Sequence, residues 1–378
     1  MKHRPFSRRK GNIVALTAVL MIVMIAFVAM SVDIGYLYTA RNELQRTADA
    51  AAIAAAWELV DKNGQAGSNN ASNLSTNASS KAIQFAALNK VCNQVPALGE
   101  GDVTVGYMAN PSNPSDTLVA TPSGMLPNAV YVRVQRTSAV NGEIPLFFAR
   151  ALGVDTKSMK AEATAALVSG FIGFTAPSDG SNLEILPFAL DADTWNGLSA
   201  QGSDVYRYDP ETKTVSAGGD GIKEVNLFPQ GTGSPGNRGT VDIGSSNNST
   251  ADIARQILYG ITPADLAYTG GSLQFGSNGE LHLNGDTGIS AGVKDELASI
   301  IGKPRLIPIF TNVVGPGNNA DYTISKFVGV RIVGVRLTGS LSDKYVMIQP
   351  CNVISKGGIY QQGATGSQYI YSPVWLVR

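Results

Sequence analysis

Three aspartates have a spacing that could support hydrolytic chemistry. Asp191 and Asp193 lie two positions apart, so on a strand both carboxylates would face the same side. Asp286 lies in the glycine-rich stretch "NGDTG" at 284–288. Paired carboxylates about 5–9.5 Å apart perform glycoside hydrolysis. Two interpretations are therefore open: these are turn residues, or they are the acids of an envelope-polymer hydrolase.

Other residue types that carry catalysis are scarce. His282 lies in the alternating stretch "ELHLN", which predicts a solvated or hydrogen-bonded strand residue. The letters "GTGSPG" at 231–236 match GxGxxG, but they lead into a turn and not into a helix, so they predict a loop. No HExxH or Walker A sequence occurs. We therefore assign no catalytic, cofactor-binding or metal-binding residue and expect no cofactor.

Cys92 and Cys351 are the only cysteines, so at most one intramolecular disulfide can form. An oxidising compartment would permit this bridge. Two separate buried thiols are the alternative, because cysteine is among the residue types most often buried.

The element that comes first in the chain is a membrane span. Residues 13–32 carry no charge, and about twenty residues rising 1.5 Å each cross the ~30 Å hydrocarbon core. The preceding tail, 1–12, is basic, and the first charge after the span is Asp33. Positive residues stay inside, so we expect a retained anchor with a cytoplasmic N-terminus and an exported remainder.

Past the span, an alanine-rich helix is expected at 33–62. Its apolar and small side chains recur at steps of three and four, a heptad stripe. Small residues let two helix backbones approach closely. The stripe could pack on the helix's own domain or form a seam for a second helix. The seam candidates are Ile34, Leu37, Leu44, Ala48, Ala51 and Ala55.

The segment "RRKGNIVALTAVLMIVMIAFVAMSVDIGYLYTARNELQRTADAAAIAAA", residues 8–56, resembles the N-terminus of TadG-like (TadE/G-like) proteins of the Tad, or Flp pilus, assembly and secretion system. The shared features are the basic tail, Gly11-Asn12, the membrane helix, Asp33-Ile34-Gly35 and the Ala-Asp-Ala-Ala block at 48–51. The resemblance implies a membrane-anchored accessory protein of pilus biogenesis. Leu16 stands where processed pilins carry glutamate, so the resemblance does not extend to peptidase processing.

The rest of the chain predicts an α+β protein. We expect a linker at 63–80, a small α+β unit at 81–170 and a β-rich exported domain at 171–378. The small unit should contain a helix from about 80 to 95, alternating strands, and a short apolar helix in "EIPLFFARALG" that stops at Gly153. Candidate strands in the β-rich part are 184–190, 223–228, 240–243, 305–314, 321–337 and 344–350, and a change of apolar phase beside Gly334 predicts a bulge or a strand buried on both faces.

Composition limits the partners. The formal net charge is +0, which argues against a nucleic-acid binder, because binding phosphates requires a basic face. The expected function is a non-enzymatic, inner-membrane accessory protein of Tad pilus assembly or secretion. Its expected partners are the membrane and other pilus-assembly membrane proteins or pilins, or a second copy. The alternatives are the anchored hydrolase above and an anchored surface-binding module.

Overall fold

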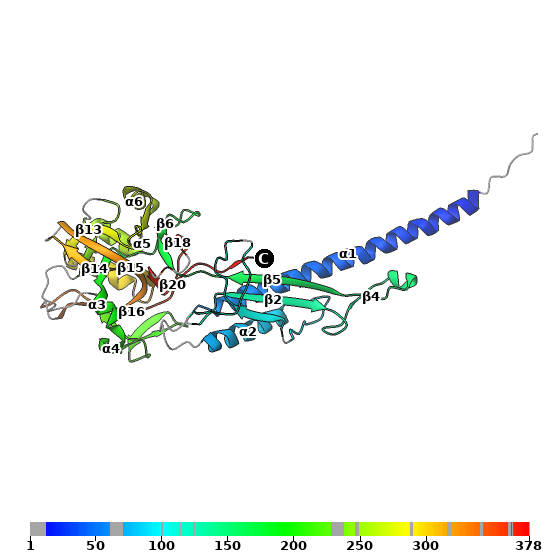
Figure 1. Ribbon diagram of the computed structural model, residues 1–378, viewed down its shortest axis with the longest axis horizontal. Coiled ribbons are helices and arrows are strands. Elements are labelled where there is room, and N and C mark those ends of the chain that lie inside the picture. The colour runs from blue at the N-terminus through cyan, green and yellow to red at the C-terminus, as the bar shows by residue number, and fades with distance from the viewer. Residues whose placement is uncertain are drawn as a thin grey trace, which may run out of the picture.

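The structure is a computed structural model, and its first element is one long helix. The structure describes residues 13–377, apart from 61–70, 228–237 and the shorter gaps 100, 114, 124, 246–248, 288–289, 316–318, 341–342, 362–363 and 365. The apolar run and the alanine-rich segment form a single unbroken helix, α1 (Ile13–Trp57), whose N-terminal half projects from the rest as a rod (Figure 1). Within the described ranges, α1 is the helix long and apolar enough to cross a membrane, and it fits a single-pass anchor.

The C-terminal part of α1 packs in a small α+β unit, called here the stalk unit (33–60, 71–167 and 375–377). Helix α2 (Ala71–Leu88) packs beside α1, and both lie on one sheet. The sheet has the order β1 (Val103–Gly106), β2 (Ala129–Arg136), β5 (Met159–Ala166) and β21 (Trp375–Leu376). Alternate valines of β2 and alanines of β5 fill the space under the helices. The expected strands of this unit are confirmed.

Several boundaries differ from the expected ones: α1 ends at Trp57 and not at 62, and α2 ends at Leu88 and not near 95. Helix α2 begins at Ala71, so the linker expected at 63–80 is wrong over 71–80, and residues 61–70 lie outside the described part. Asn and Ser dominate 71–80 and weaken the helical pattern, but Leu74 and Ala78 are buried against α1. In addition, β21 returns from the C-terminus to pair with β5, which local patterning could not predict.

A hairpin extends from the stalk unit along α1. It consists of β3 (Ile144–Pro145), the 3-10 helix η1 (Ala149–Leu152) and β4 (Thr156–Lys157). Gly153 ends η1 in a left-handed conformation, with φ 81°, as expected for a helix stop. Residues 146–154, which lie between the paired strands, are called the hairpin tip.

The remaining chain, 168–374, forms the distal domain at the end of the molecule away from the N-terminal half of α1 (Figure 1). Its strands are β6 (Phe171–Thr175), β7 (Phe188–Asp191), β8 (Tyr206–Asp209), β9 (Thr214–Ala217), β10 (Val225–Asn226), β11 (Arg238–Val241), β12 (Ser272–Gln274), β13 (Leu281–Thr287), β14 (Pro304–Val314), β15 (Ala320–Arg336), β16 (Tyr345–Pro350), β17 (Val353–Ile354), β18 (Gly358–Tyr360), β19 (Ser367–Gln368) and β20 (Ile370–Tyr371). Its helices are α3 (Ala192–Asn196), α4 (Leu198–Gln201), α5 (Thr250–Tyr259), α6 (Pro263–Tyr268), η2 (Ala291–Val293) and α7 (Lys294–Ser299).

The main sheet of the distal domain closes on itself. Pairing runs β15–β13–β11–β7–β14 and returns from β14 to β15, so five strands form a ring. Tyr322 and Phe310 meet edge-on on one side of the sheet, with ring centroids 5.0 Å apart. A second apolar cluster covers the other side of the strands. The α+β fold class, with a β-rich domain after the helix, is confirmed.

The apolar pattern of strand β15 changes phase near its C-terminal end because the strand contains a bulge there. The register with β16 shifts between Ile332 and Gly334, and residues 327–330 and 332–334 are buried on both faces. The predicted bulge is therefore present. A side chain at Gly334 would place Cβ 2.5 Å from the Tyr206 hydroxyl, so the bulge also brings the backbone close to a tyrosine.

Candidate functional site at the membrane boundary

Asp33, the first residue past the apolar span, is buried against the hairpin tip. It is 4% exposed, and its carboxylate accepts backbone hydrogen bonds from Phe147 (2.8 Å), Phe148 (3.0 Å) and Ala149 (2.7 Å). These N–H groups start η1, where no preceding carbonyl can accept from them. One side chain of α1 thus satisfies three donors of a segment more than 110 residues away.

The electrostatics of Asp33 favour the ionised form. Burial alone would raise its pKa, but the hydrogen bonds from Ala149, Phe147 and Phe148 and the nearby Arg150 hold the pKa below its ordinary value. A carboxylate that accepts several backbone N–H bonds is stabilised as the anion. The contact is therefore a set of three charge-assisted hydrogen bonds that hold the hairpin tip against α1.

An apolar hollow of about 680 Å³ lies between α1 and the hairpin tip. Residues of the span, from Ile22 to Met30, form one wall, and Leu146, Phe148 and Leu152 form part of the other. Near Asp33, the Tyr36 ring packs edge-on against the Phe147 ring of the hairpin tip, with ring centroids 5.2 Å apart.

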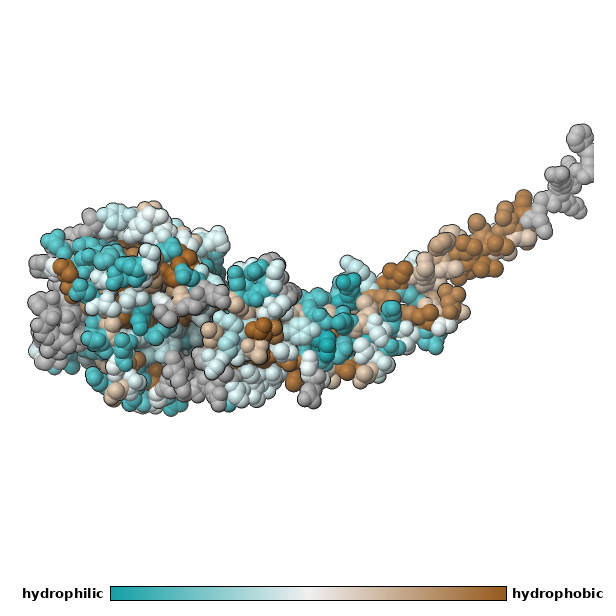
Figure 2. Space-filling model, viewed as in Figure 1, coloured by the Kyte–Doolittle hydropathy of each residue, from teal (hydrophilic) through white to brown (hydrophobic). Residues whose placement is uncertain are grey.

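Several large apolar side chains of the hairpin tip face outward. Leu152 is 85% exposed, and Phe147, Phe148 and Val154 are about half exposed. They lie beside the exposed apolar surface of the span, and Figure 2 shows brown atoms both along the projecting helix and on the end of the stalk unit next to it. The membrane boundary is thus a continuous apolar surface with one buried carboxylate.

The alanine stripe meets a second helix, but this helix belongs to the same chain. Leu44, Ala48, Ala51 and Ala55 are all 0% exposed and share a cluster with Ala78, Ala82 and Ala86 of α2. These four seam candidates are therefore closed to a partner helix, and the alternative, packing within the helix's own domain, agrees with the structure. The remaining candidates differ: Ile34 is 57% exposed, Leu37 is half-buried, and both line the apolar hollow.

The possible disulfide between Cys92 and Cys351 is absent, and both thiols are free. Cys92 lies in the stalk unit, where its N–H donates to Glu43, whereas Cys351 is buried in the distal domain 3.0 Å from Arg331 Nη2. Burial raises the pKa of the Cys351 thiol. The sequence permitted a bridge, but the fold places the two cysteines in different units.

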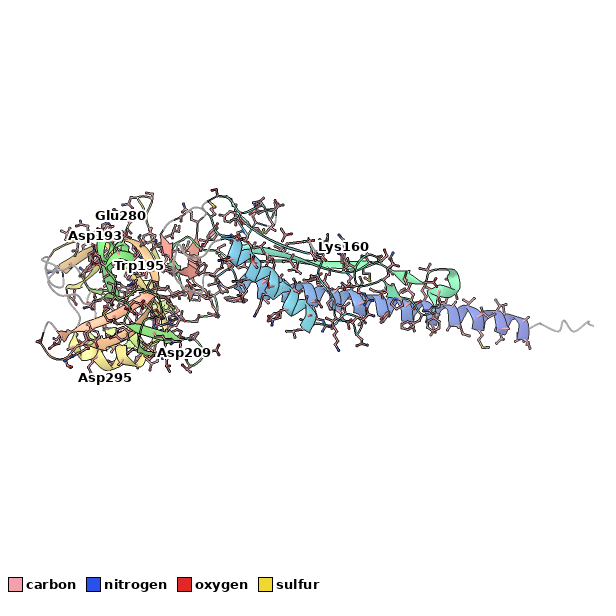
Figure 3. The ribbon with its side chains drawn as sticks, turned by 90° about the horizontal axis from the view of Figure 1, so that it is seen from below. Lys160, Asp193, Trp195, Asp209, Glu280 and Asp295 are labelled. Atoms are coloured by element: carbon pink, nitrogen blue, oxygen red, sulfur yellow. The ribbon has the colours of Figure 1, made fainter. Side chains whose placement is uncertain are left out.

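The candidate acids of the hydrolase interpretation are not arranged as a pair. Asp191 and Asp193 do not share a strand face, because the chain turns into α3 at Ala192 and Asp191 caps that helix by accepting from the Thr194 N–H at 2.8 Å. Figure 3 shows Asp193 on the distal domain, far from Lys160 of the stalk unit.

Asp286 lies on another strand. Across β11, Thr240 pairs with Asp286 on one side and with Phe188 on the other, three residues before Asp191. Two strand spacings and three residue steps put the Asp191 and Asp286 backbones roughly 14 Å apart. Paired glycosidase carboxylates lie within about 9.5 Å.

The other sequence features have ordinary roles where they are described. His282 is an exposed strand residue whose Nδ1 lies 3.1 Å from an Asp321 carboxylate oxygen. The stretch "GTGSPG" lies outside the described residues. Among the residues that the structure describes, no group of three or more His, Cys, Asp or Glu side chains could hold a metal ion.

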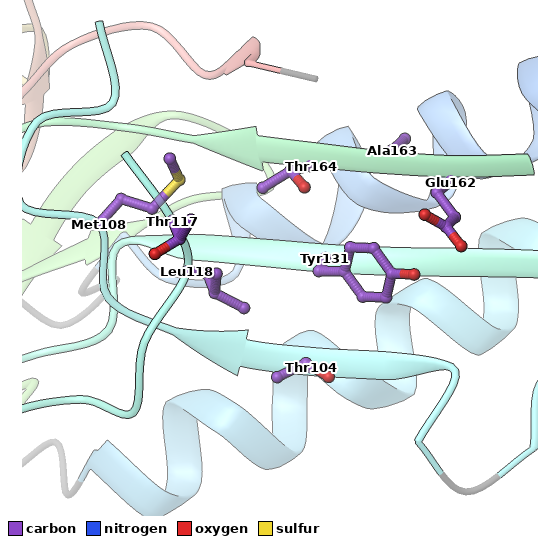
Figure 4. A pocket seen from close by; sticks show the side chains of 8 residues that line it. All are labelled: Thr104, Met108, Thr117, Leu118, Tyr131, Glu162, Ala163 and Thr164. Atoms are coloured by element: carbon purple, nitrogen blue, oxygen red, sulfur yellow. The ribbon is translucent and has the colours of Figure 1, made fainter. Parts of the chain in front are cut away.

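A smaller hollow of about 370 Å³ lies over the stalk sheet (Figure 4). Tyr131 and Glu162 project into it from β2 and β5, and Met108 and Leu118 of a covering loop form part of its wall. Burial and the adjacent Glu162 raise the pKa of Tyr131, so the phenol stays neutral at physiological pH. The hollow combines a neutral hydroxyl with one carboxylate, which is a polar surface and not a nucleophile with a base.

Sequence reasoning missed the role of Asp33. The available signals were its place as the first charged residue after the span and the adjacent phenylalanines in "PLFFARALG". Local patterning could not join them, because more than 110 residues separate the two segments.

Comparison with known proteins adds the family. Residues 11–58 match the TadE/G-like Flp pilus-assembly family, and residues 54–165 match the Tad-like Flp pilus-assembly family. The two matches meet near the end of α1 and finish within β5, so they cover α1 and most of the stalk unit but not the distal domain. No curated protein and no solved structure matches the chain. Over residues 11–165, the chain is therefore similar to the TadE/G-like and Tad-like proteins of Flp pilus assembly.

Proposed function

We propose that the protein is a membrane-anchored, non-enzymatic accessory component of Flp pilus assembly or Tad secretion. It lies in the inner membrane with its N-terminus in the cytoplasm, and it carries the stalk unit and the distal domain on the other side. The basic residues at 2–10 precede the span, which supports this orientation.

The continuity of α1 is the observation that carries the proposal. The helix runs without a break from the span to Trp57, and its second half is buried in the stalk core. The 25 residues from Asp33 to Trp57 extend about 37 Å at 1.5 Å per residue. An anchored enzyme needs only a flexible linker to keep it at the membrane. An assembly component benefits from a rigid helix that holds its distal domain at a fixed distance from the bilayer.

The partners in this proposal are other pilus-assembly membrane proteins or pilins. They would contact the surfaces that the chain leaves open, namely the span and the distal domain, since the alanine stripe is filled by α2. The membrane is the remaining partner, and no nucleic acid is involved.

Co-purification from membranes tests the proposal. We expect the tagged full-length protein to recover pilus-assembly components from detergent extracts, and protease added outside spheroplasts to digest the chain beyond Asp33. Recovery without any such component, or a protected C-terminus, would contradict it.

A matched pair of variants separates assembly from hydrolysis. Asp191→Asn, Asp193→Asn and Asp286→Asn together should leave pilus assembly intact, whereas a flexible Gly-Ser insertion after Ile34, which interrupts the rod, should impair it. The same insertion in the described loop after Gly180, exposed on the distal domain, is the control. Loss of assembly from the aspartate variant alone would favour the hydrolase.

A further inference from the structure

We propose that the hairpin tip, residues 146–154, inserts into the phospholipid bilayer beside α1 and forms a second membrane contact of the stalk unit. This inference rests on α1 crossing the membrane and does not depend on the role in pilus assembly. It assigns the exposed apolar surface of the tip to the lipid of the leaflet nearest Asp33.

The position of the tip along α1 is the first step. Its side chains share the apolar hollow with Ile22, Ala26 and Met30 of the span. Ile22 lies ten residues before Val32, the last residue of the span, which is about 15 Å along the helix axis. A bilayer that covers the span therefore reaches the level of the tip.

The exposed side chains are the second step. Phe147, Phe148, Leu152 and Val154 are between 48% and 85% exposed. Single apolar residues on a surface are ordinary, but four within eight positions, beside a bare apolar helix, make a patch. Continuity with the lipid-facing surface of α1 identifies the bilayer as the medium that covers this patch.

The backbone supplies an independent argument. A loop that enters a bilayer must satisfy its N–H groups within the protein, because no water is available there. Asp33 accepts from three of them, at Phe147, Phe148 and Ala149. The N–H groups of residues 146, 151, 153 and 154 donate to the carbonyls of Asp155, Phe148, Arg150 and Ala149, respectively. These N–H groups are thus satisfied within the protein, as entry into a bilayer requires.

The basic side chains of Arg150, in the tip, and Lys157, in the adjoining strand β4, fit the headgroup region. Arg150 and Lys157 are exposed, and Arg150 Nε donates to the Leu146 carbonyl at 3.0 Å. Long basic side chains extend from an apolar surface to lipid phosphates. Asp33 is shielded from hydrocarbon by its three N–H partners. Two contacts, the span and the tip, would fix the tilt and rotation of the stalk unit on the membrane.

Depth-dependent quenching in lipid nanodiscs tests the proposal with the full-length chain. Leu152→Trp places an indole at the most exposed apolar position of the tip, and Val205→Trp is the control at an exposed position, 54% exposed, of the distal domain. Emission of the parent protein, with Trp57, Trp195 and Trp375, is subtracted. Nanodiscs of phosphatidylcholine and phosphatidylglycerol with brominated acyl chains are compared with unbrominated ones.

We expect the indole of Leu152→Trp to emit at shorter wavelength and to lose most of its emission in brominated lipid, while Val205→Trp stays unchanged. Phe148→Trp is a second probe at a half-exposed position, in case the first variant folds poorly. Equal, unquenched emission at positions 152 and 205 would overturn the proposal, because the tip would face water. A blue-shifted but unquenched indole would also overturn it, because protein, such as a second copy, would then cover the tip.

Discussion

The carboxylate of Asp33 accepts a 2.7 Å hydrogen bond from the backbone N–H of Ala149, which lies 116 residues further along the chain. The same carboxylate holds Phe147 and Phe148. The end of the span is thereby joined to the hairpin tip through one side chain.

Removing the Asp33 carboxylate should release the hairpin tip. Asp33→Ala leaves three N–H groups without an acceptor, and Asp33→Asn retains a single acceptor oxygen, so amide exchange at residues 147–149 should accelerate in the order wild type, Asn, Ala. Hydrogen-exchange mass spectrometry in nanodiscs measures this. Asp49→Asn, at an α1 carboxylate that accepts from Gln45, is the control and should leave these amides protected. Unchanged amide exchange in Asp33→Ala would show that Asp33 does not hold the hairpin tip against α1.

A larger residue at the contact between α1 and α2 should destabilise the stalk unit. Ala82 is 0% exposed within the alanine cluster, so Ala82→Leu should lower the free energy of unfolding by about 1–3 kcal/mol through overpacking. Ala87→Leu, at an exposed position of the same helix, should change it by less than about 0.5 kcal/mol. Chemical denaturation followed by helical circular dichroism compares the two. Equal effects would show that α2 does not pack as described.

Acid should weaken the distal domain through Asp265. Burial alone would raise its pKa, but the bidentate pair with Arg255 (2.8 and 3.0 Å) and the hydrogen bonds from Thr262 lower it below 3.8. In the unfolded chain, the Asp265 carboxyl group has the ordinary aspartate pKa of about 3.9. A lowered folded pKa gives stability that is complete above about pH 4 and is lost as the pH falls through the folded value.

The test of this linkage is the melting temperature at several pH values. The wild-type distal domain should lose more stability below about pH 4 than Asp265→Asn, whose amide does not titrate in this range. Arg255→Ala should cost roughly 1 kcal/mol near neutral pH, a modest value because Arg255 is partly exposed. Parallel pH profiles of wild type and Asp265→Asn would reject the role of this carboxylate.

The ring of strands requires a bare backbone at Gly239. A Cβ there would lie 1.9 Å from the Asp286 carbonyl oxygen and 2.4 Å from the Tyr322 hydroxyl, so Gly239→Ala should force β11 away from β13. We expect a loss of at least about 1–3 kcal/mol, as for other overpacked sites. Gly276→Ala, on the same domain, meets only the Asn278 side-chain oxygen at 3.1 Å and the Glu280 carbonyl at 3.6 Å, and it should cost less. Thermal unfolding of the two variants gives the comparison.

Patterns among neighbouring residues were sufficient to predict the local features of the fold. The uncharged run at 13–32, the strands expected at 305–314 and 321–337, and the phase change beside Gly334 all appear where the pattern predicts them. Each follows from hydrogen bonding or burial within about one turn of helix or one strand. The same locality explains why the N-terminal segment resembles its family over residues 8–56.

Tertiary structure alone decided what the alanine stripe packs against and what Asp33 binds. Small side chains permit close approach by any helix, and the chain's own α2 occupies the stripe because it is linked nearby at high effective concentration. Asp33 binds backbone N–H groups, which carry no side-chain signature, so their sequence cannot identify them as partners. The separation of Cys92 from Cys351 and the return of β21 to the stalk sheet likewise depend on contacts between distant segments, which local spacing does not encode.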